Sequence, residues 1–123
     1  MKPYETLTVC GCEYHLKFTT ANAVKLEEEL KTDILSGLDR LAEIGILAKY
    51  YFYAAKSLND SINSIDDVYS MFDDYITDGG SIDDLKNLVI EIMFTSGILS
   101  QQLYDASKKF AGKQQEALQK LLN

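Results

Sequence analysis

The chain has 123 residues, of which 46% are hydrophobic and 25% charged, an ordinary composition for a globular protein. This length predicts a single domain with a core large enough to fold without disulfides or a structural metal. No apolar run reaches the roughly 18 residues of a membrane span, and the first residues lack the apolar stretch of a signal peptide. We therefore expect a cytoplasmic protein that does not bind a membrane.

Charge is distributed unevenly along the chain. The net charge is −7, and the stretch from Asp60 to Glu91 alone holds nine acids and one base, Lys86, a local charge of −8. Residues 1–59 hold seven bases and eight acids, and residues 92–123 hold four bases and two acids. A protein that binds nucleic acid needs a positively charged surface, so this pattern argues against nucleic acid as a partner. The acidic stretch indicates a solvated helix face with capping aspartates; a basic protein partner or mimicry of nucleic acid is the alternative.

Residues 4–19 alternate between apolar and polar side chains, as β-strands do. Leu7 and Val9 share one face of the first strand, with threonines on the other. The second strand alternates Tyr14, Leu16 and Phe18 with His15 and Lys17. Gly11 between the strands predicts a tight hairpin turn. Because an isolated hairpin is only marginally stable, this one is expected to pack on helices or to pair with another chain.

Cys10, Cys12 and His15 form a small group of metal-ligand types at the hairpin. A structural zinc site takes four ligands, and the second half of such a site is missing. His15 is the only histidine and therefore the only imidazole base for a nucleophile. The sequence predicts two free thiols, a solvent-facing histidine, no metal, no cofactor and no catalysis.

Helical spacing begins after the hairpin. Ala23, Leu26 and Leu30 predict a helix capped by Thr19 or Thr20. A second helical pattern covers residues 33–44 and consists of Ile34, Leu35, Leu38, Leu41 and Ala42. Gly45 either separates this segment from a third helix or interrupts a longer one.

Four consecutive aromatic residues, Tyr50, Tyr51, Phe52 and Tyr53, lie in the third helical segment. At about 100° per residue they cover roughly 300° of a helix surface, so they do not all face one core. Either this helix is buried on nearly every side, or part of the cluster lies on a surface that binds a partner. All four are candidate partner-binding residues.

The phrase Ser-Ile-Asp-Asp occurs at residues 64–67 and again at residues 81–84, directly after Gly79 and Gly80. Each copy predicts a helix start at which the serine caps the helix and the second aspartate reaches back to it. The two glycines end the first of these helices. Capping accounts for the aspartates without a metal site, and a calcium loop is excluded because Ile76 and Leu85 stand where carboxylates are needed.

The last helices complete the predicted domain. The helix after Ser64 is expected to bury Ile65, Val68, Tyr69, Phe72 and Ile76. The helix after Ser81 is apolar on several sides and is predicted to be the central one. Residues 1–98 are thus expected to form one α+β domain, mainly α, with a hairpin and a bundle of about five helices.

Residues 99–123 read as an amphipathic helical tail. Its apolar positions follow a spacing of three and four and are Leu99, Leu103, Ala106, Phe110, Ala117 and Leu121. The large ones, Leu99, Leu103 and Phe110, are further candidate partner-binding residues.

Several stretches resemble the tail assembly chaperones of siphophages and prophages of Gram-positive hosts. The resemblance begins with residues 14–20, which lead into residues 24–27, and continues at residues 66–69. Its most specific part is residues 72–81, Phe-Asp-Asp-Tyr-Ile-Thr-Asp-Gly-Gly-Ser, followed by Leu85 and Ser96-Gly97. It covers about residues 12–98.

This resemblance implies a protein without catalysis. It implies binding to the tape measure protein, contact with the tail tube protein, self-association, a cytoplasmic location in the bacterial host and absence from the mature virion. Two other functions stay open, namely an acidic interaction module such as an anti-repressor or a nucleic-acid mimic, and a structural tail component.

Overall fold

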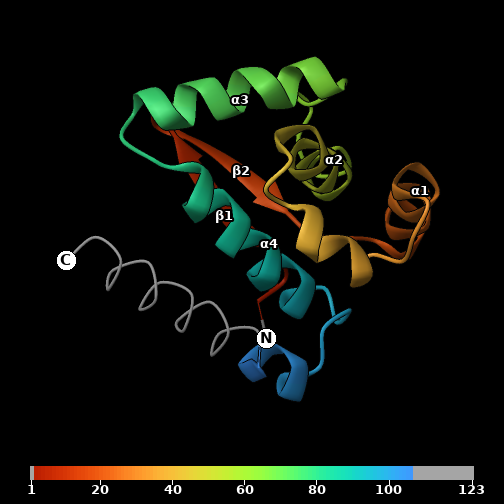
Figure 1. Cartoon of the computed structure of the whole chain (residues 1–123). Coiled ribbons are helices and arrows are strands. Elements are labelled where there is room, and N and C mark those ends of the chain that lie inside the picture. Colours follow the sequence, from red (N-terminus) through yellow and green to blue (C-terminus); the bar gives the residue numbers. More distant parts are fainter. Residues whose placement is uncertain (1, 107–123) are drawn as a thin grey trace.

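The structure, a computed structural model, describes residues 2–106. A two-stranded antiparallel hairpin is followed by helices: β1 (Glu5–Val9), β2 (Cys12–Leu16), α1 (Thr20–Leu30), the 3₁₀ helix η1 (Ser36–Arg40), α2 (Ile44–Ala55), α3 (Ile65–Thr77) and α4 (Ile82–Thr95). Residues 101–106 are also helical. Figure 1 shows α2 nearly end-on, with the other elements around it. The predicted fold class, α+β and mainly α, with an N-terminal hairpin and about five helices, is confirmed.

The hairpin closes with a two-residue turn. Val9 pairs with Cys12, which leaves Cys10 and Gly11 between the strands. Both turn residues have positive φ, 50° and 83°, as a type I′ turn requires. The predicted faces are also confirmed, with Leu7, Val9, Leu16 and Phe18 buried and Thr6 and Thr8 exposed.

The hairpin packs on helices, and a side chain closes the outer edge of β2. Asn59, which follows α2, accepts a hydrogen bond from the His15 N–H (3.0 Å) and donates one to the His15 carbonyl (2.7 Å). The Lys17 N–H donates to the Ala54 carbonyl (3.0 Å), and the Phe18 N–H donates to the Ser96 hydroxyl (2.9 Å). These bonds satisfy edge groups that a third strand would otherwise take.

Residues 33–44 do not form the predicted α-helix: Ser36–Arg40 form the 3₁₀ turn η1, and α2 begins only at Ile44. The Asp33 carboxylate accepts a hydrogen bond from the Ser36 N–H (3.1 Å), which starts a tight turn. Gly37 is buried against α2, where a Cβ would collide with the Tyr50 hydroxyl. Gly45 lies in the first turn of α2, so it follows a helix boundary and does not interrupt a helix.

The central helix is α2, so the prediction that the helix after Ser81 is central was wrong. The main contacts of α2 are with α1, α3, α4 and β2, whereas those of α4 are with α2 and β1. Three alanines of α2, Ala48, Ala54 and Ala55, are completely buried, and their small side chains let the neighbouring elements approach closely. Apolar composition alone did not distinguish these two helices.

Both predicted helix starts are confirmed. At the start of α4, the Ser81 hydroxyl accepts a hydrogen bond from the Asp84 N–H (3.2 Å), and the Asp84 carboxylate accepts one from the Ser81 N–H (3.3 Å). At the start of α3, the Asp67 carboxylate accepts hydrogen bonds from the backbone N–H groups of Asn63 and Ser64, at 2.8 and 3.0 Å. Asp67 and Asp84 therefore both take part in capping.

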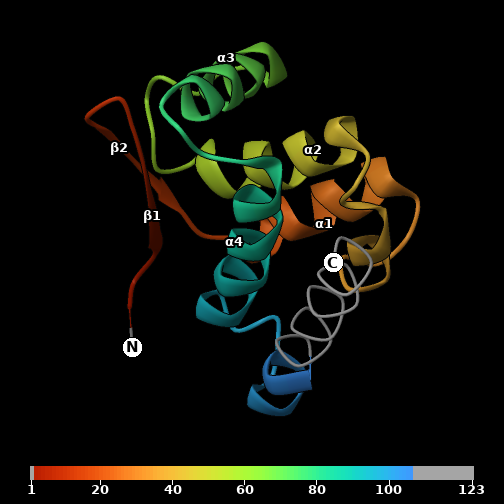
Figure 2. The ribbon, with the colours of Figure 1, turned by 60° about the vertical axis from the view of Figure 1, so that its left-hand side comes forward.

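Gly79 and Gly80 form the predicted corner between α3 and α4 (Figure 2). The Gly79 N–H donates to the Ile76 carbonyl (3.1 Å), and the Gly80 N–H donates to the Tyr75 carbonyl (2.9 Å). This is the bonding pattern of a Schellman motif, which needs a left-handed residue, and Gly79 has φ 101°. Gly80 lies against the Tyr75 ring, where no Cβ fits.

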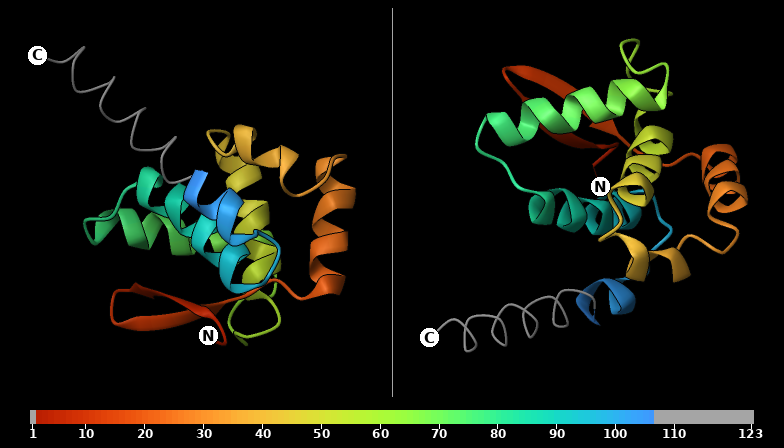
Figure 3. Two further views of the ribbon diagram at one scale, coloured as in Figure 1. Left: turned by 90° about the horizontal axis from the view of Figure 1, so that it is seen from below. Right: turned by 45° about the horizontal axis from the view of Figure 1, so that its top comes forward.

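Packing continues beyond residue 98. Leu99 is buried, and Tyr104 stacks on Phe94 with 4.4 Å between ring centroids. The Tyr104 hydroxyl donates to the Glu91 carboxylate (2.7 Å). Residues 101–106 lie near the end of α4 that is far from α3 in Figure 1, and α4 lies between them and α3 in the right-hand view of Figure 3. The remainder of the predicted tail lies outside the described residues.

Candidate protein-binding surface

The structure divides the four consecutive aromatic residues into two buried and two half-buried. Tyr50 and Tyr51 are completely buried, which corrects their assignment as surface residues for a partner. The Tyr50 hydroxyl donates to the Ile34 carbonyl (2.7 Å) and the Tyr51 hydroxyl to the Leu85 carbonyl (2.6 Å). Burial raises the pKa of both hydroxyls above the ordinary tyrosine value. These two side chains connect α2 to the segment around η1 and to α4.

Phe52 and Tyr53 lie on the other side of α2, together with Lys49 and Lys56, and none of these four is buried. The spacing of three, four and seven residues places them on one side of the helix. We call this set the aromatic face of α2. It is the part of the predicted aromatic cluster that a partner can reach.

The side chains of the aromatic face contact one another. The Phe52 and Tyr53 rings meet edge-on, with 5.2 Å between centroids. The Lys56 ammonium lies 5.4 Å from the Phe52 centroid and 5.5 Å from the Tyr53 centroid, which is within cation–π range. Partial burial and the nearby Glu29 carboxylate raise the pKa of Tyr53 to about 12. The face therefore presents ring surface with a cation above it, and an acid of α1 beside it.

The three candidate residues of the tail differ in their surroundings. Leu99 is buried in the core, which corrects its assignment as a surface residue. Its backbone N–H donates to the Met93 carbonyl (3.2 Å), which directs the chain back onto α4. Leu103 is 48% exposed and available to a partner. Phe110 lies outside the described residues.

A second exposed apolar surface lies on α3, on a side of the helix that was predicted to face the core. Tyr69 and Ile76 were expected to be buried, but they are 39% and 44% exposed. The buried residues of α3 are Val68, Met71 and Phe72. Including Met71 in the apolar set would have shifted the predicted core side away from Tyr69 and Ile76, because Met71 lies across the helix from them.

We call Tyr69 and Ile76, with the exposed Asp66 and Asp73, the α3 edge. Seven residues make about two helical turns, so Tyr69 and Ile76 lie above one another. Asp66 and Asp73 follow the same spacing on their solvent side. This edge is an apolar strip bordered by carboxylates.

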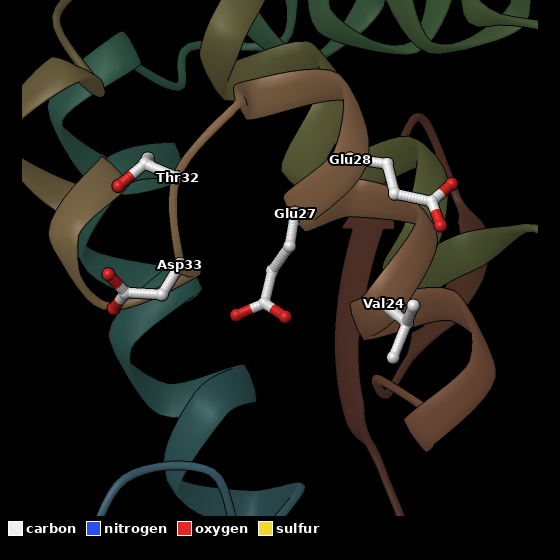
Figure 4. A pocket seen from close by; sticks show the side chains of 5 residues that line it. All are labelled: Val24, Glu27, Glu28, Thr32 and Asp33. Atoms are coloured by element: carbon white, nitrogen blue, oxygen red, sulfur yellow. The ribbon is translucent and has the colours of Figure 1, made fainter.

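A shallow hollow of about 340 Å³ lies beside α1 and is lined by Val24, Glu27, Glu28, Thr32 and Asp33 (Figure 4). Two of its three carboxylates, those of Glu27 and Asp33, accept hydrogen bonds from the nearby backbone. Glu27 accepts a hydrogen bond from the Ile34 N–H (2.9 Å), and hydrogen bonds from Ser36 lower the pKa of Asp33. The hollow has no positively charged group in its lining and contains no pair of an acid and a base suited to catalysis.

The hairpin carries both cysteines of the chain. Cys10 and Cys12 are exposed free thiols, and partial desolvation with the Asp78 and Asp74 carboxylates raises the pKa of Cys10, which disfavours its thiolate. Among residues 2–106, no group of three or more His, Cys, Asp or Glu side chains is placed to hold a metal ion.

His15 is not solvent-facing as predicted. Its ring lies against Tyr4, with 4.1 Å between ring centroids, and is half-buried. Its Nδ1 is buried and has no hydrogen-bond partner among the described residues. The alternation along β2 placed this side chain on the correct face, but Tyr4 covers that face.

The comparisons with known proteins give no relative. No family model matches the chain, and neither the curated proteins nor the solved structures that were compared with it include a match. Within residues 2–106, no helix has the length and apolar character needed to cross a membrane.

Proposed function

We propose that this protein is a phage tail assembly chaperone, which binds the tape measure protein and keeps it soluble during tail assembly. The observation that carries the proposal is the aromatic face of α2, where Phe52 and Tyr53 are only partly buried on a strongly acidic protein. The sequence resemblance supplies the identity of the partner. The hairpin and the capped helical pair with its Gly-Gly corner agree with the pattern on which that resemblance rests.

The chemistry of the aromatic face suits a long apolar helix. Flat rings offer contact area with little loss of side-chain entropy, and the Lys56 ammonium lies within cation–π distance of both rings. A surface of this small size gives a weak contact, which fits a chaperone that is displaced before the tail is complete. The net charge of −7 keeps such a complex in solution.

The proposal includes the cellular setting. The protein acts in the cytoplasm of the bacterial host, contacts the tape measure protein and the tail tube protein, self-associates, and is absent from the mature virion. Leu103 adds exposed apolar surface for these contacts. The protein carries out no catalysis.

Co-expression with a tape measure fragment tests the proposal. We expect a soluble complex in size-exclusion chromatography with light scattering, and at least a tenfold weaker complex for the double variant Phe52→Gln and Tyr53→Gln. Ile44→Gln is the matched control, because Ile44 is 53% exposed at the start of the same helix but lies outside the aromatic face. A fragment that stays insoluble, or equal losses in the two variants, would contradict the proposal.

A second candidate function is an acidic interaction module that binds a basic protein, as an anti-repressor or a nucleic-acid mimic does. The local charge of −8 over residues 60–91, from nine acids and one base, favours it. Because salt screens exposed charges, such binding would weaken steeply between about 0.05 and about 0.5 M salt. Binding of an apolar helix would not weaken in this way.

Detection of the protein in purified virions would instead indicate a structural tail component.

A further inference from the structure

Two segments of opposite charge, residues 107–123 and helix α3, lie far apart in the sequence. Residues 107–123, which lie outside the described residues, contain Lys108, Lys109, Lys113 and Lys120 and a single acid, Glu116. The α3 edge contains Asp66 and Asp73, and α3 has no lysine or arginine. Both segments also contain large apolar residues. The two segments are therefore complementary in charge, and each offers apolar surface to the other.

The α3 edge is shaped for an amphipathic segment. Tyr69 and Ile76 form an apolar strip two helical turns long, and both side chains are more than a third exposed. A partner for this strip needs two or three large apolar side chains in helical spacing and positive charge for Asp66 and Asp73. Residues 114–123 carry Leu118, Leu121 and Leu122 at that spacing, with Lys120 between them and Lys113 just before them.

We propose that the end of the chain, residues 114–123, binds the α3 edge of the same molecule. The leucines cover Tyr69 and Ile76, and Lys113 and Lys120 lie near Asp73 and Asp66. The proposal concerns a different surface from the aromatic face of α2, so it does not depend on the proposed function.

The length of the chain allows this contact. The last described segment, residues 101–106, lies near the end of α4 that is far from α3 (Figure 1), where Tyr104 packs on Phe94. The 14 residues of α4 span about 21 Å. About seven extended residues cover that length, so the 17 residues from 107 to 123 are long enough to return along α4 to the nearer end of α3, with at most about ten left for binding. A tether of this length also gives a local concentration in the millimolar range, which favours binding within one molecule over binding between molecules.

Disulfide trapping in the full chain tests the proposal. In a Cys10→Ser, Cys12→Ser background, Ile76→Cys is combined with Leu121→Cys and oxidised at low micromolar concentration. The matched control combines Leu121→Cys with Lys25→Cys, an exposed position on α1. We expect an internal disulfide to form at least tenfold faster in the first pair, and we expect 0.5 M salt to reduce this difference.

Two results would overturn the proposal. Equal rates in the two pairs would show that the chain end has no preferred site. Disulfide-linked dimers in place of internal crosslinks would show that it binds a second copy. Amide chemical shifts give an independent measurement without new cysteines: replacing Lys113 and Lys120 by Gln is expected to shift the signals of Tyr69 and Ile76, and unchanged signals would contradict the contact.

Discussion

The hydroxyl of Tyr51 in α2 donates a 2.6 Å hydrogen bond to the carbonyl oxygen of Leu85 in α4. Both residues are completely buried, and the Tyr51 ring also meets the Phe72 ring of α3 edge-on, at 5.1 Å between centroids. One side chain of the central helix therefore contacts both members of the capped helical pair.

Loss of this bond is expected to lower stability. Tyr51→Phe keeps the ring and removes the hydroxyl, so we expect the free energy of unfolding to fall by about 1 kcal/mol in urea titrations. Tyr69→Phe is the control. Because Tyr69 is 39% exposed, removing its hydroxyl group should lower the free energy of unfolding by less than about 0.5 kcal/mol. Equal effects of the two substitutions would show that the buried hydrogen bond does not contribute.

Stability is expected to decrease in strong alkali. Burial raises the folded-state pKa of Tyr50 and Tyr51, so folding favours their neutral forms. In the unfolded chain each ionises near pH 10, and the stabilisation present below that pH is lost as the pH rises further, by up to about 1.4 kcal/mol per pH unit for each residue. Unfolding measured between pH 9 and about 12 should show a smaller pH slope in Tyr50→Phe. An unchanged slope would contradict the burial of this hydroxyl.

Two glycines are expected to respond in opposite directions to alanine. Gly79 has φ 101°, so Gly79→Ala should destabilise the corner between α3 and α4 by about 1 kcal/mol. Gly45 lies in the first turn of α2 with open space around it, so Gly45→Ala should stabilise the protein by about 0.5 kcal/mol. Thermal unfolding of the two variants checks both signs, and a loss of stability in both would refute the assignment of Gly45 to a helix.

Asp67 and its neighbour Asp66 allow capping to be separated from charge. Backbone hydrogen bonds from Asn63 and Ser64 lower the pKa of Asp67, so its stabilisation is present above about pH 4 and is lost as the pH falls below that value. At pH 7 we expect Asp67→Ala to lower stability and Asp66→Ala, which keeps the cap, to lower it much less. The difference should shrink at pH 2 to 3 in denaturant titrations. A constant difference across this range would contradict the capping role.

The local elements of this fold follow from short stretches of sequence. The turn at Gly11, the serine caps with their aspartates and the Gly79-Gly80 corner depend on backbone conformations and hydrogen bonds within a few residues. The same locality explains why Asp67 and Asp84 were correctly assigned to helix starts. For these local elements the sequence alone was sufficient to predict the structure.

Burial, by contrast, was decided by the tertiary structure. Whether Tyr50 or Phe52 faces the core depends on where α1, η1 and α3 lie around α2, and Tyr69 and Ile76 have the same spacing whether or not a neighbour covers them. Asn59 closes the edge of β2 from a distant part of the chain, and Tyr4 covers His15. These contacts join residues far apart in the sequence, and periodicity identifies an apolar side of a helix but not the element that covers it.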